Sequence, residues 1–406
     1  MASTAAGQLL LIAATPLLTR LYAPDDFGVF GVFWAMISVV AVISSLRYEI
    51  AIPLPPRDLN ARHLLVLALI INAIVAILAF FTVLLLHDPI VRWTGAPGLA
   101  TCLWLLPPGL LFVGSYKAFN YWAIRNRDYT RIGKTRILQS CTNVSVQLGA
   151  GFMGAGAVGM VSGQLLGQIM GISSLARGLK LRAFCASPLF SLKRMRILIR
   201  RYRRFPLYDV PASAVDVLSV QLPPLLLAAF FGPTVAGFYI LAERVLGMPA
   251  GLLAQAIGQV LYGSVRHAME KQQLHRLTLR IVLGLGGLVL IPAIILTLSG
   301  ESLFNWVFGS PWRNAGLYAI CMVWGLCAQV IYSPLSMILM ATEGQKTNLL
   351  IHSTLLLLKI LAIAYGYSQQ NPVLAVMGFS LAGMVGYGLG IAIILRRTKR
   401  LSLPKG

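Results

Sequence analysis

The sequence has 406 residues, of which 57% are hydrophobic and 11% are charged, and its formal net charge is +22. Such a basic chain could bind nucleic acid, but its apolar residues form long unbroken runs instead of stripes with the helical period of about 3.6 residues. Runs of about 20 apolar residues match the roughly 30 Å hydrocarbon core of a bilayer. The composition therefore excludes a soluble nucleic-acid-binding protein and predicts an all-α integral membrane protein.

Twelve apolar runs are long enough to cross a membrane. They lie near residues 3–20, 27–46, 64–86, 99–124, 132–154, 157–176, 207–231, 234–264, 277–298, 315–341, 349–367 and 373–395. The core of a signal peptide is the alternative for the first run, but its first basic residue, Arg20, follows the run instead of preceding it. The sequence therefore predicts about twelve transmembrane helices.

The basic residues predict the orientation of these helices. If the N-terminus is cytoplasmic, 28 of the 34 Lys and Arg residues fall in cytoplasmic segments, and only Arg20, Arg92 and Arg313 lie on the opposite side. Short basic segments resist translocation across the membrane. Both termini are therefore expected in the cytoplasm.

The most basic segment, KRMRILIRRYRRF at 193–205, has seven Lys or Arg among thirteen residues. We interpret it as a cytoplasmic connection whose cations face anionic lipid head groups. Its apolar residues Ile197, Leu198, Ile199, Tyr202 and Phe205 are then expected to enter the membrane interface.

This connection, residues 177–206, divides the chain into two predicted six-helix bundles, residues 1–176 and 207–406. The last helix of each predicted bundle carries small residues at every fourth position. These are Gly159, Gly163, Gly167 and Gly171 in the first bundle, and Gly378, Ala382, Gly386 and Gly390 in the second. Such ladders give a helix one smooth face, so we expect neighbouring backbones to approach it closely.

Motifs for catalysis, metals and cofactors are missing from the sequence. The five cysteines form no C-x-x-C pair, and the five histidines show no metal-ligand spacing. The stretch DYTRIGKT at 128–135 imitates a phosphate-binding loop, but Asp128 occupies the position of the first glycine. We therefore expect no enzyme activity, no metal and no cofactor.

Five charged residues fall well inside predicted spans, away from the span ends, at a cost of about 2.5–3.5 kcal/mol each at a helix centre. They are Lys117, Asp216, Glu243, Arg244 and Lys359. Lys117 could instead extend to the membrane interface, and Asp216 and Glu243 could either couple a counter-ion or pair with neighbouring cations. Cations exceed acids in this set, which favours an anionic substrate.

Several blocks of the sequence resemble the polysaccharide transporter family, the lipid-linked oligosaccharide flippases of bacterial envelope synthesis. The blocks are PLLTRLYAPDDFGVFGVF (16–33), SLRYEIAIPLP (45–55), GFYILAERVLGMPAGLLAQAIGQVLY (237–262), LFNWVFGSPWRNAGLYA (303–319) and SPLSMILMATEGQKTNLL (333–350). The resemblance implies the multidrug/oligosaccharidyl-lipid/polysaccharide exporter fold. In that fold two six-helix bundles surround a central cavity and work by alternating access.

The resemblance also implies a function. The expected substrate is an undecaprenyl-diphosphate-linked glycan, flipped across the bacterial cytoplasmic membrane for surface polysaccharide synthesis. Arg20, Arg47 and Arg244 occupy the basic motif positions of the family, and with Lys117 and Lys359 they form the predicted substrate-binding set. Anionic lipids and the glycan polymerase machinery are the expected partners.

Two other functions remain as alternatives. A drug or cation antiporter of the same superfamily would need an acidic cavity, which the excess of embedded cations disfavours. An envelope polysaccharide polymerase or glycosyltransferase would need a long external loop or clustered catalytic acids, which the sequence lacks.

The charge distribution makes a direct prediction about topology. Single cysteines replacing Ser191 or Ser310, in a background without native cysteines, should react differently with an impermeant maleimide on intact cells. Position 310 should be labelled and position 191 should not, because the basic segments remain inside. Labelling of position 191 from outside would reverse the orientation.

Overall fold

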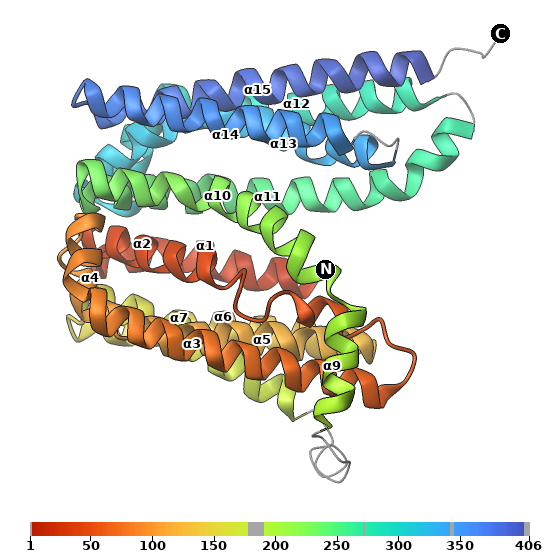
Figure 1. The fold of residues 1–406 in the computed structure, drawn as a ribbon. Coiled ribbons are helices and arrows are strands. Elements are labelled where there is room, and N and C mark those ends of the chain that lie inside the picture. Colours follow the sequence, from red (N-terminus) through yellow and green to blue (C-terminus); the bar gives the residue numbers. More distant parts are fainter. Residues whose placement is uncertain (1, 178–190, 271–272, 342–344, 402–406) are drawn as a thin grey trace. The chain divides into compact units, whose positions relative to one another are not determined.

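The structure is a computed structural model that describes the chain except residues 1, 178–190, 271–272, 342–344 and 402–406 (Figure 1). The regular structure of the described residues is helical throughout, which confirms the all-α prediction. Eight of the described helices are long and apolar enough to cross a membrane. Contacts group the chain into two units, Met1–Gly237 and Phe238–Gly406, which are described separately below.

Unit 1 contains the helices from the N-terminus to the end of α10. They are α1 (Ala2–Leu21), α2 (Pro24–Val40), η1 (Tyr48–Ala51), α3 (Asp58–Thr94), α4 (Leu99–Leu103), α5 (Leu106–Arg125), α6 (Tyr129–Phe152), α7 (Gly156–Ala176), α9 (Leu192–Arg201), η2 (Phe205–Asp209) and α10 (Val210–Phe231). The next helix, α11 (Pro233–Glu270), begins in unit 1 and continues into unit 2, which also contains α12 (Leu274–Phe308), η3 (Ser310–Trp312), α13 (Arg313–Ala341), α14 (Gln345–Ser368) and α15 (Pro372–Leu401). Each of the twelve predicted spans therefore overlaps at least one of these helices.

Two predicted spans are interrupted. The span 27–46 is helical only to Val40, and the chain then turns through Leu46 and Arg47, whose φ angles of 48° and 62° no α-helix can contain. The span 99–124 breaks between α4 and α5, where Pro107 and Pro108 follow the first residue of α5. Proline has no backbone N–H and fits the first turn of a helix, so the chain restarts a helix there.

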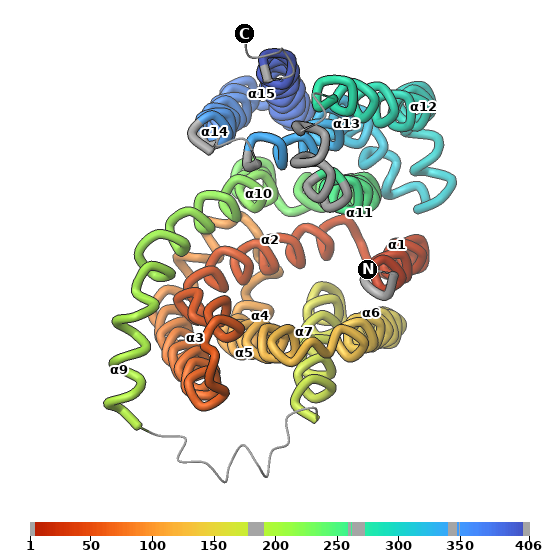
Figure 2. Tube along the Cα trace, turned by 90° about the vertical axis from the view of Figure 1, so that its right-hand side faces the viewer, coloured from red at the N-terminus to blue at the C-terminus, as the bar shows by residue number. Residues whose placement is uncertain are grey.

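In unit 1, α6 packs against both α1 and α7, and α7 also packs against α2 and α5, as the end-on view shows (Figure 2). Helix α3 packs against α5, while α10 packs against α2. Contacts thus group α10 with the first unit, whereas the sequence predicts that the second bundle begins at residue 207. That earlier boundary remains a prediction.

The glycine ladder of α7 lies directly against α6. A Cβ atom added at Gly163 would lie 2.5 Å from Gln147 Cγ and 2.9 Å from the Asn143 carbonyl oxygen. At Gly159 it would lie 2.8 Å from the Ala150 Cβ. The ladder therefore brings α7 against the backbone of α6, which confirms the close approach that the sequence predicts.

In unit 2, α15 packs against α13 and α14, and α12 packs against α13. The second small-residue ladder lies in these contacts. A Cβ atom at Gly386 would lie 2.5 Å from Leu355 Cδ2 of α14, and one at Gly390 would lie 2.5 Å from the Tyr332 ring of α13. This ladder also serves close packing, but against bulky apolar side chains instead of polar ones.

The basic segment forms a short amphipathic helix, α9, which runs across the direction of α3 and α5 (Figures 1 and 2). Leu198 of α9 is 4% exposed and joins a core cluster that includes Tyr48 and Leu64, with Tyr202 and Phe205 packed against it. The expectation that all its apolar residues enter the lipid interface is therefore wrong for Leu198, because the protein itself covers that side chain.

The ladder predicts how substitutions of two helix glycines differ. Gly163→Ala should lower the Tm of the detergent-purified protein, because its Cβ would overlap α6 and overpacking costs about 1–3 kcal/mol. The matched control is Gly149→Ala on α6, where an added Cβ meets nothing within 4 Å and alanine favours the helix. A Tm of Gly163→Ala as high as that of Gly149→Ala would contradict the packing role of the ladder.

Candidate functional site

Arg47 lies in the turn after α2, at a predicted substrate-binding position. Its Nε is 2.9 Å from Oδ2 of Asp209, and its Nη2 donates a hydrogen bond to the Ser213 hydroxyl. These contacts tie the end of α2 to the start of α10. The sequence did not predict Asp209 as the ion-pair partner of Arg47, although Asp209 is the first acidic residue after Asp128 and follows the basic segment.

Lys117 of α5 also bonds to the turn after α2. Its Nζ donates to the Ala41 carbonyl oxygen at 3.0 Å, one of the carbonyls that the end of α2 leaves without a helical partner. Its charge also interacts with that of Glu49, a carboxylate that is 1% exposed and accepts a hydrogen bond from Ser45. Lys117 is therefore held by protein groups.

These residues form one charge cluster at the end of α2, which we call the α2-end cluster. It contains two cations, Arg47 and Lys117, and two acids, Glu49 and Asp209. The charges balance, and each cation already has an oxygen partner. This cluster therefore suits the joining of α2, α5 and α10 better than the binding of an anion.

Two other predicted residues of unit 1 lie at its surface. Arg20 is exposed in the last turn of α1, and Asp216 is exposed on α10. No ion pair joins Asp216 to another described residue. The structure thus brings Arg47 and Lys117 together but leaves Arg20 and Asp216 outside the α2-end cluster.

Unit 2 holds a different arrangement around Lys359 of α14. The Lys359 Nζ lies 4.4 Å from the centre of the Phe379 ring and 5.6 Å from that of Tyr387, both on α15. At these distances the ring faces attract a cation. The charge of Lys359 also interacts with that of Glu243 on α11.

A third aromatic residue extends this arrangement to α11. Tyr239, one turn before Glu243, packs edge-on against Phe379 with ring centres 6.3 Å apart and an interplanar angle of 86°. Phe379 and Tyr387 are eight residues apart and lie on one helix face of α15, a spacing that could have indicated a shared partner from the sequence.

Arg244 follows Glu243 on α11 and is 9% exposed. Its Nε has no hydrogen-bond partner among the described residues. A guanidinium is always charged and carries five donors, so burial with an unused donor is unfavourable unless an anion completes it. With Lys359 and Glu243 it gives unit 2 two embedded cations against one acid.

Comparison with known proteins assigns the family. A family model described as "Polysaccharide biosynthesis protein" matches residues 17–316, well over half of the chain. The chain belongs to this family. With eight described helices long and apolar enough to cross a membrane, it is a multi-pass membrane protein of a polysaccharide biosynthesis family.

Individual relatives agree with this assignment. The "Lipopolysaccharide biosynthesis protein WzxC" of Escherichia coli (strain K12) is 26% identical over 196 residues, which span 48% of this chain and 39% of that protein. The match thus covers well under two thirds of that relative.

Solved transporters share the fold. The lipid II flippase MurJ in an inward closed conformation has a TM-score of 0.79 at 14% identity, covering 98% of this chain and 89% of its own. An inward-facing multidrug resistance MATE family transporter of the MOP superfamily has a TM-score of 0.76 at 17% identity, covering 98% and 96%. At these identities the likeness shows the fold alone.

The contact of Lys359 with Phe379 predicts a coupled effect on stability. Phe379→Leu should lower the Tm of the purified protein more in the native background than in the Lys359→Met background. Leucine keeps the apolar volume but lacks the ring face, whose attraction for the Lys359 cation is worth about 0.5–2 kcal/mol. The control is Phe304→Leu, a buried unit 2 aromatic on α12, whose effect should be equal in both backgrounds. Equal losses for Phe379→Leu in both backgrounds would show that no cation–π attraction exists.

Proposed function

We propose that the protein is a flippase that moves a polyprenyl-diphosphate-linked oligosaccharide from the inner to the outer leaflet of the bacterial cytoplasmic membrane. The observation that carries this proposal is the buried Arg244, whose Nε lacks a hydrogen-bond partner among the described residues. A diphosphate offers the anion that such a group lacks. Membership of a polysaccharide biosynthesis family supports a glycan as the rest of the substrate.

Each part of this substrate needs a different environment. A sugar head and a diphosphate cannot cross hydrocarbon unaided, because their polar groups would lose hydration without replacement. Arg244 replaces part of that hydration, since a guanidinium binds phosphate through two parallel hydrogen bonds. Lys359 adds a second positive charge in the same unit, while the polyprenyl tail stays in the lipid.

The substrate-binding roles in unit 2 therefore rest on Arg244 and Lys359, with Glu243 as a candidate for counter-ion coupling. An inside-negative membrane potential favours outward movement of an anion by about 2.3 kcal/mol per charge for each 100 mV. In the predicted orientation, with 28 of 34 basic residues in the cytoplasm, the substrate loads from the cytoplasmic leaflet. Undecaprenyl diphosphate is the carrier that the family resemblance implies.

A drug or cation antiporter is the competing function, because the MATE transporters share the fold. A cation substrate requires an excess of acidic groups at its site. Among Glu243, Arg244 and Lys359 the cations are in excess, and Lys359 already occupies the faces of Phe379 and Tyr387. The charges of unit 2 thus support an anionic substrate.

Arg244 is the residue whose substitution tests the proposal. In a flippase-deficient strain, Arg244→Ala should reduce surface glycan about tenfold or more while membrane protein level stays near normal. Arg244→Lys should restore only part of the glycan, because a point charge cannot form two parallel hydrogen bonds to phosphate.

The matched control is Arg313→Ala. Arg313 is exposed and its Nε lies 3.1 Å from Oε2 of Glu301, an exposed pairing of the kind worth at most about 1 kcal/mol, so its loss should leave surface glycan unchanged. Normal glycan in Arg244→Ala would refute the phosphate contact. So would a glycan defect that only follows a loss of protein, because Arg244 would then act in folding.

A further inference from the structure

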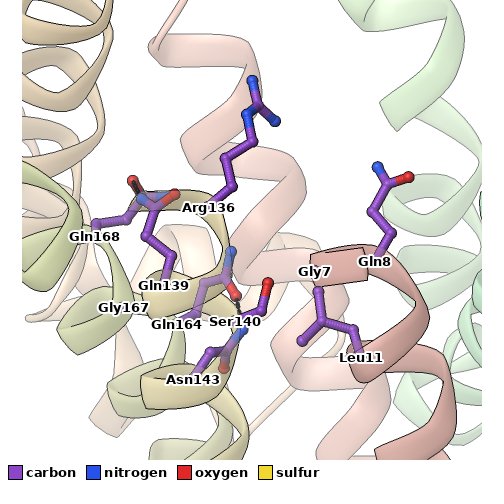
Figure 3. Close-up of a pocket in the computed structure, with 10 residues that line it drawn as sticks. All are labelled: Gly7, Gln8, Leu11, Arg136, Gln139, Ser140, Asn143, Gln164, Gly167 and Gln168. Atoms are coloured by element: carbon purple, nitrogen blue, oxygen red, sulfur yellow. Dashed lines mark hydrogen bonds between the residues drawn. The ribbon is translucent and has the colours of Figure 1, made fainter. Parts of the chain in front are cut away.

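A partly open polar cavity of about 200 Å³ lies among α1, α6 and α7 of unit 1 (Figure 3). We call it the amide pocket after the side chains that line it, Gln8 of α1, Gln139 and Asn143 of α6, and Gln164 and Gln168 of α7. Arg136 and Ser140 of α6 also line it, and no acidic residue is found among its described lining. So many amides are unusual in the interior of a membrane-spanning bundle, where polar groups are expensive to bury.

The amides form two rows, Gln139 and Asn143 on α6 and Gln164 and Gln168 on α7, and hydrogen bonds join one row to the other. Gln139 Nε2 donates to Gln168 Oε1 at 3.2 Å, and Asn143 Nδ2 donates to Gln164 Oε1. The members of each row are one helical turn apart, so they share one helix face. Figure 3 shows these side chains on one side of the cavity and the Gly7, Gln8 and Leu11 positions of α1 on the other.

The glycine ladder makes room for this arrangement. A Cβ atom at Gly171 would lie 2.4 Å from the Gln139 Nε2, and one at Gly167 would lie 3.0 Å from the Gln139 carbonyl oxygen. Any larger residue at these positions would push α7 away from the amides of α6. The shape of the pocket is therefore built into the helix packing.

Two hydrogen-bond acceptors of the pocket are left over. Asn143 is 7% exposed, and neither its Oδ1 nor the buried Oε1 of Gln8 has a hydrogen-bond partner among the described residues. Buried polar atoms are normally paired, so unused acceptors on two residues that line the pocket indicate a ligand that donates hydrogen bonds. The Arg136 side chain adds donors of its own at the same cavity.

We propose that the amide pocket binds one sugar ring of the lipid-linked glycan, an inference that rests on the proposed flippase function. Sugar hydroxyls both donate and accept, as amides do, so each can satisfy an amide oxygen and an amide N–H. The cavity is smaller than the roughly 300–1,000 Å³ of pockets for drug-sized ligands, which suits a single ring. Without an acid in its described lining, it does not suit a cation.

This site gives the transporter a means of glycan recognition that is separate from the diphosphate. The carrier diphosphate is common to many envelope glycans, so contacts with it cannot distinguish one from another. A pocket built to hydrogen-bond hydroxyls rejects a ligand that lacks them, because its buried polar groups are then left unpaired. Arg244 accordingly serves affinity for the carrier, and the amide pocket serves selection of the sugar.

Binding to the full-length purified protein in nanodiscs tests the inference with two probes. The first is undecaprenyl diphosphate without sugar, and the second is the lipid-linked glycan extracted from a flippase-deficient strain. The native protein should bind the second at least about tenfold more tightly than the first. Gln8→Met and Asn143→Leu, which keep side-chain size but remove the amide, should lose most of this gain and keep their affinity for undecaprenyl diphosphate.

The matched control is Gln147→Met, one turn beyond Asn143 on α6. Gln147 is buried, as Asn143 is, but it lies outside the pocket lining, and its Nε2 donates to the Met160 carbonyl oxygen at 3.0 Å. The Gln147→Met variant should therefore keep the sugar-dependent gain in affinity. An unchanged gain in the pocket variants, or an equal loss in the control, would overturn the inference. If the native protein binds neither probe, the proposed function itself fails.

A protection experiment covers the case in which Asn143→Leu does not fold. Ser140→Cys, in a background without native cysteines, should be shielded from a small maleimide by the lipid-linked glycan at least about tenfold better than by undecaprenyl diphosphate. Equal reactivity with the two lipids would also overturn the sugar site.

Discussion

Polar side chains within membrane-spanning helices must find partners inside the protein, and in unit 1 the glycine ladder of α7 makes this possible. Helix α6 carries Gln139, Asn143 and Gln147 at four-residue spacing, directly opposite the ladder. Since glycine has no side chain, the amides fit between the backbones and bond to α7. The close approach of α6 and α7, the polar cavity beside them and the packing of α1 all depend on this arrangement.

The two units hold their embedded charges in different ways. In unit 1 the cations of the α2-end cluster are matched by carboxylates, so the cluster joins helices without leaving a net charge. In unit 2 Lys359 packs on aromatic rings and interacts with the charge of Glu243, while Arg244 keeps a donor without a partner among the described residues. This difference favours a division of labour in which unit 2 meets the anionic part of the substrate and unit 1 meets the sugar.

Much of the fold could be predicted because the membrane imposes strong constraints on sequence. Each apolar run predicted from the sequence overlaps a described helix, eight of the described helices are long and apolar enough to cross a membrane, and the four-residue glycine spacing indicated the close contact of α7. The turn at residues 41–47 could not be seen, because Leu46 and Arg47 give no local sign that they adopt positive φ angles. The burial of Leu198 depends on its contacts with η1 and α3, which are distant in sequence.

The site was predictable in its charges but not in their partners. Arg244 and Lys359 stood out because charged residues are rare in apolar runs. The pairing of Arg47 with Asp209, and of Lys359 with Phe379, depends on tertiary packing that spacing along one chain does not encode. The amides of α6 could not be recognised as part of a pocket from the sequence, because the pocket exists only through the packing of α1, α6 and α7.

The flippase proposal can be tested by transport in proteoliposomes that contain the purified protein, with a fluorescent undecaprenyl-diphosphate-linked glycan followed by a membrane-impermeant quencher. A flippase should give protein-dependent movement of this lipid between the leaflets and no accumulation of a cationic dye. Dye transport without lipid movement would refute the proposal.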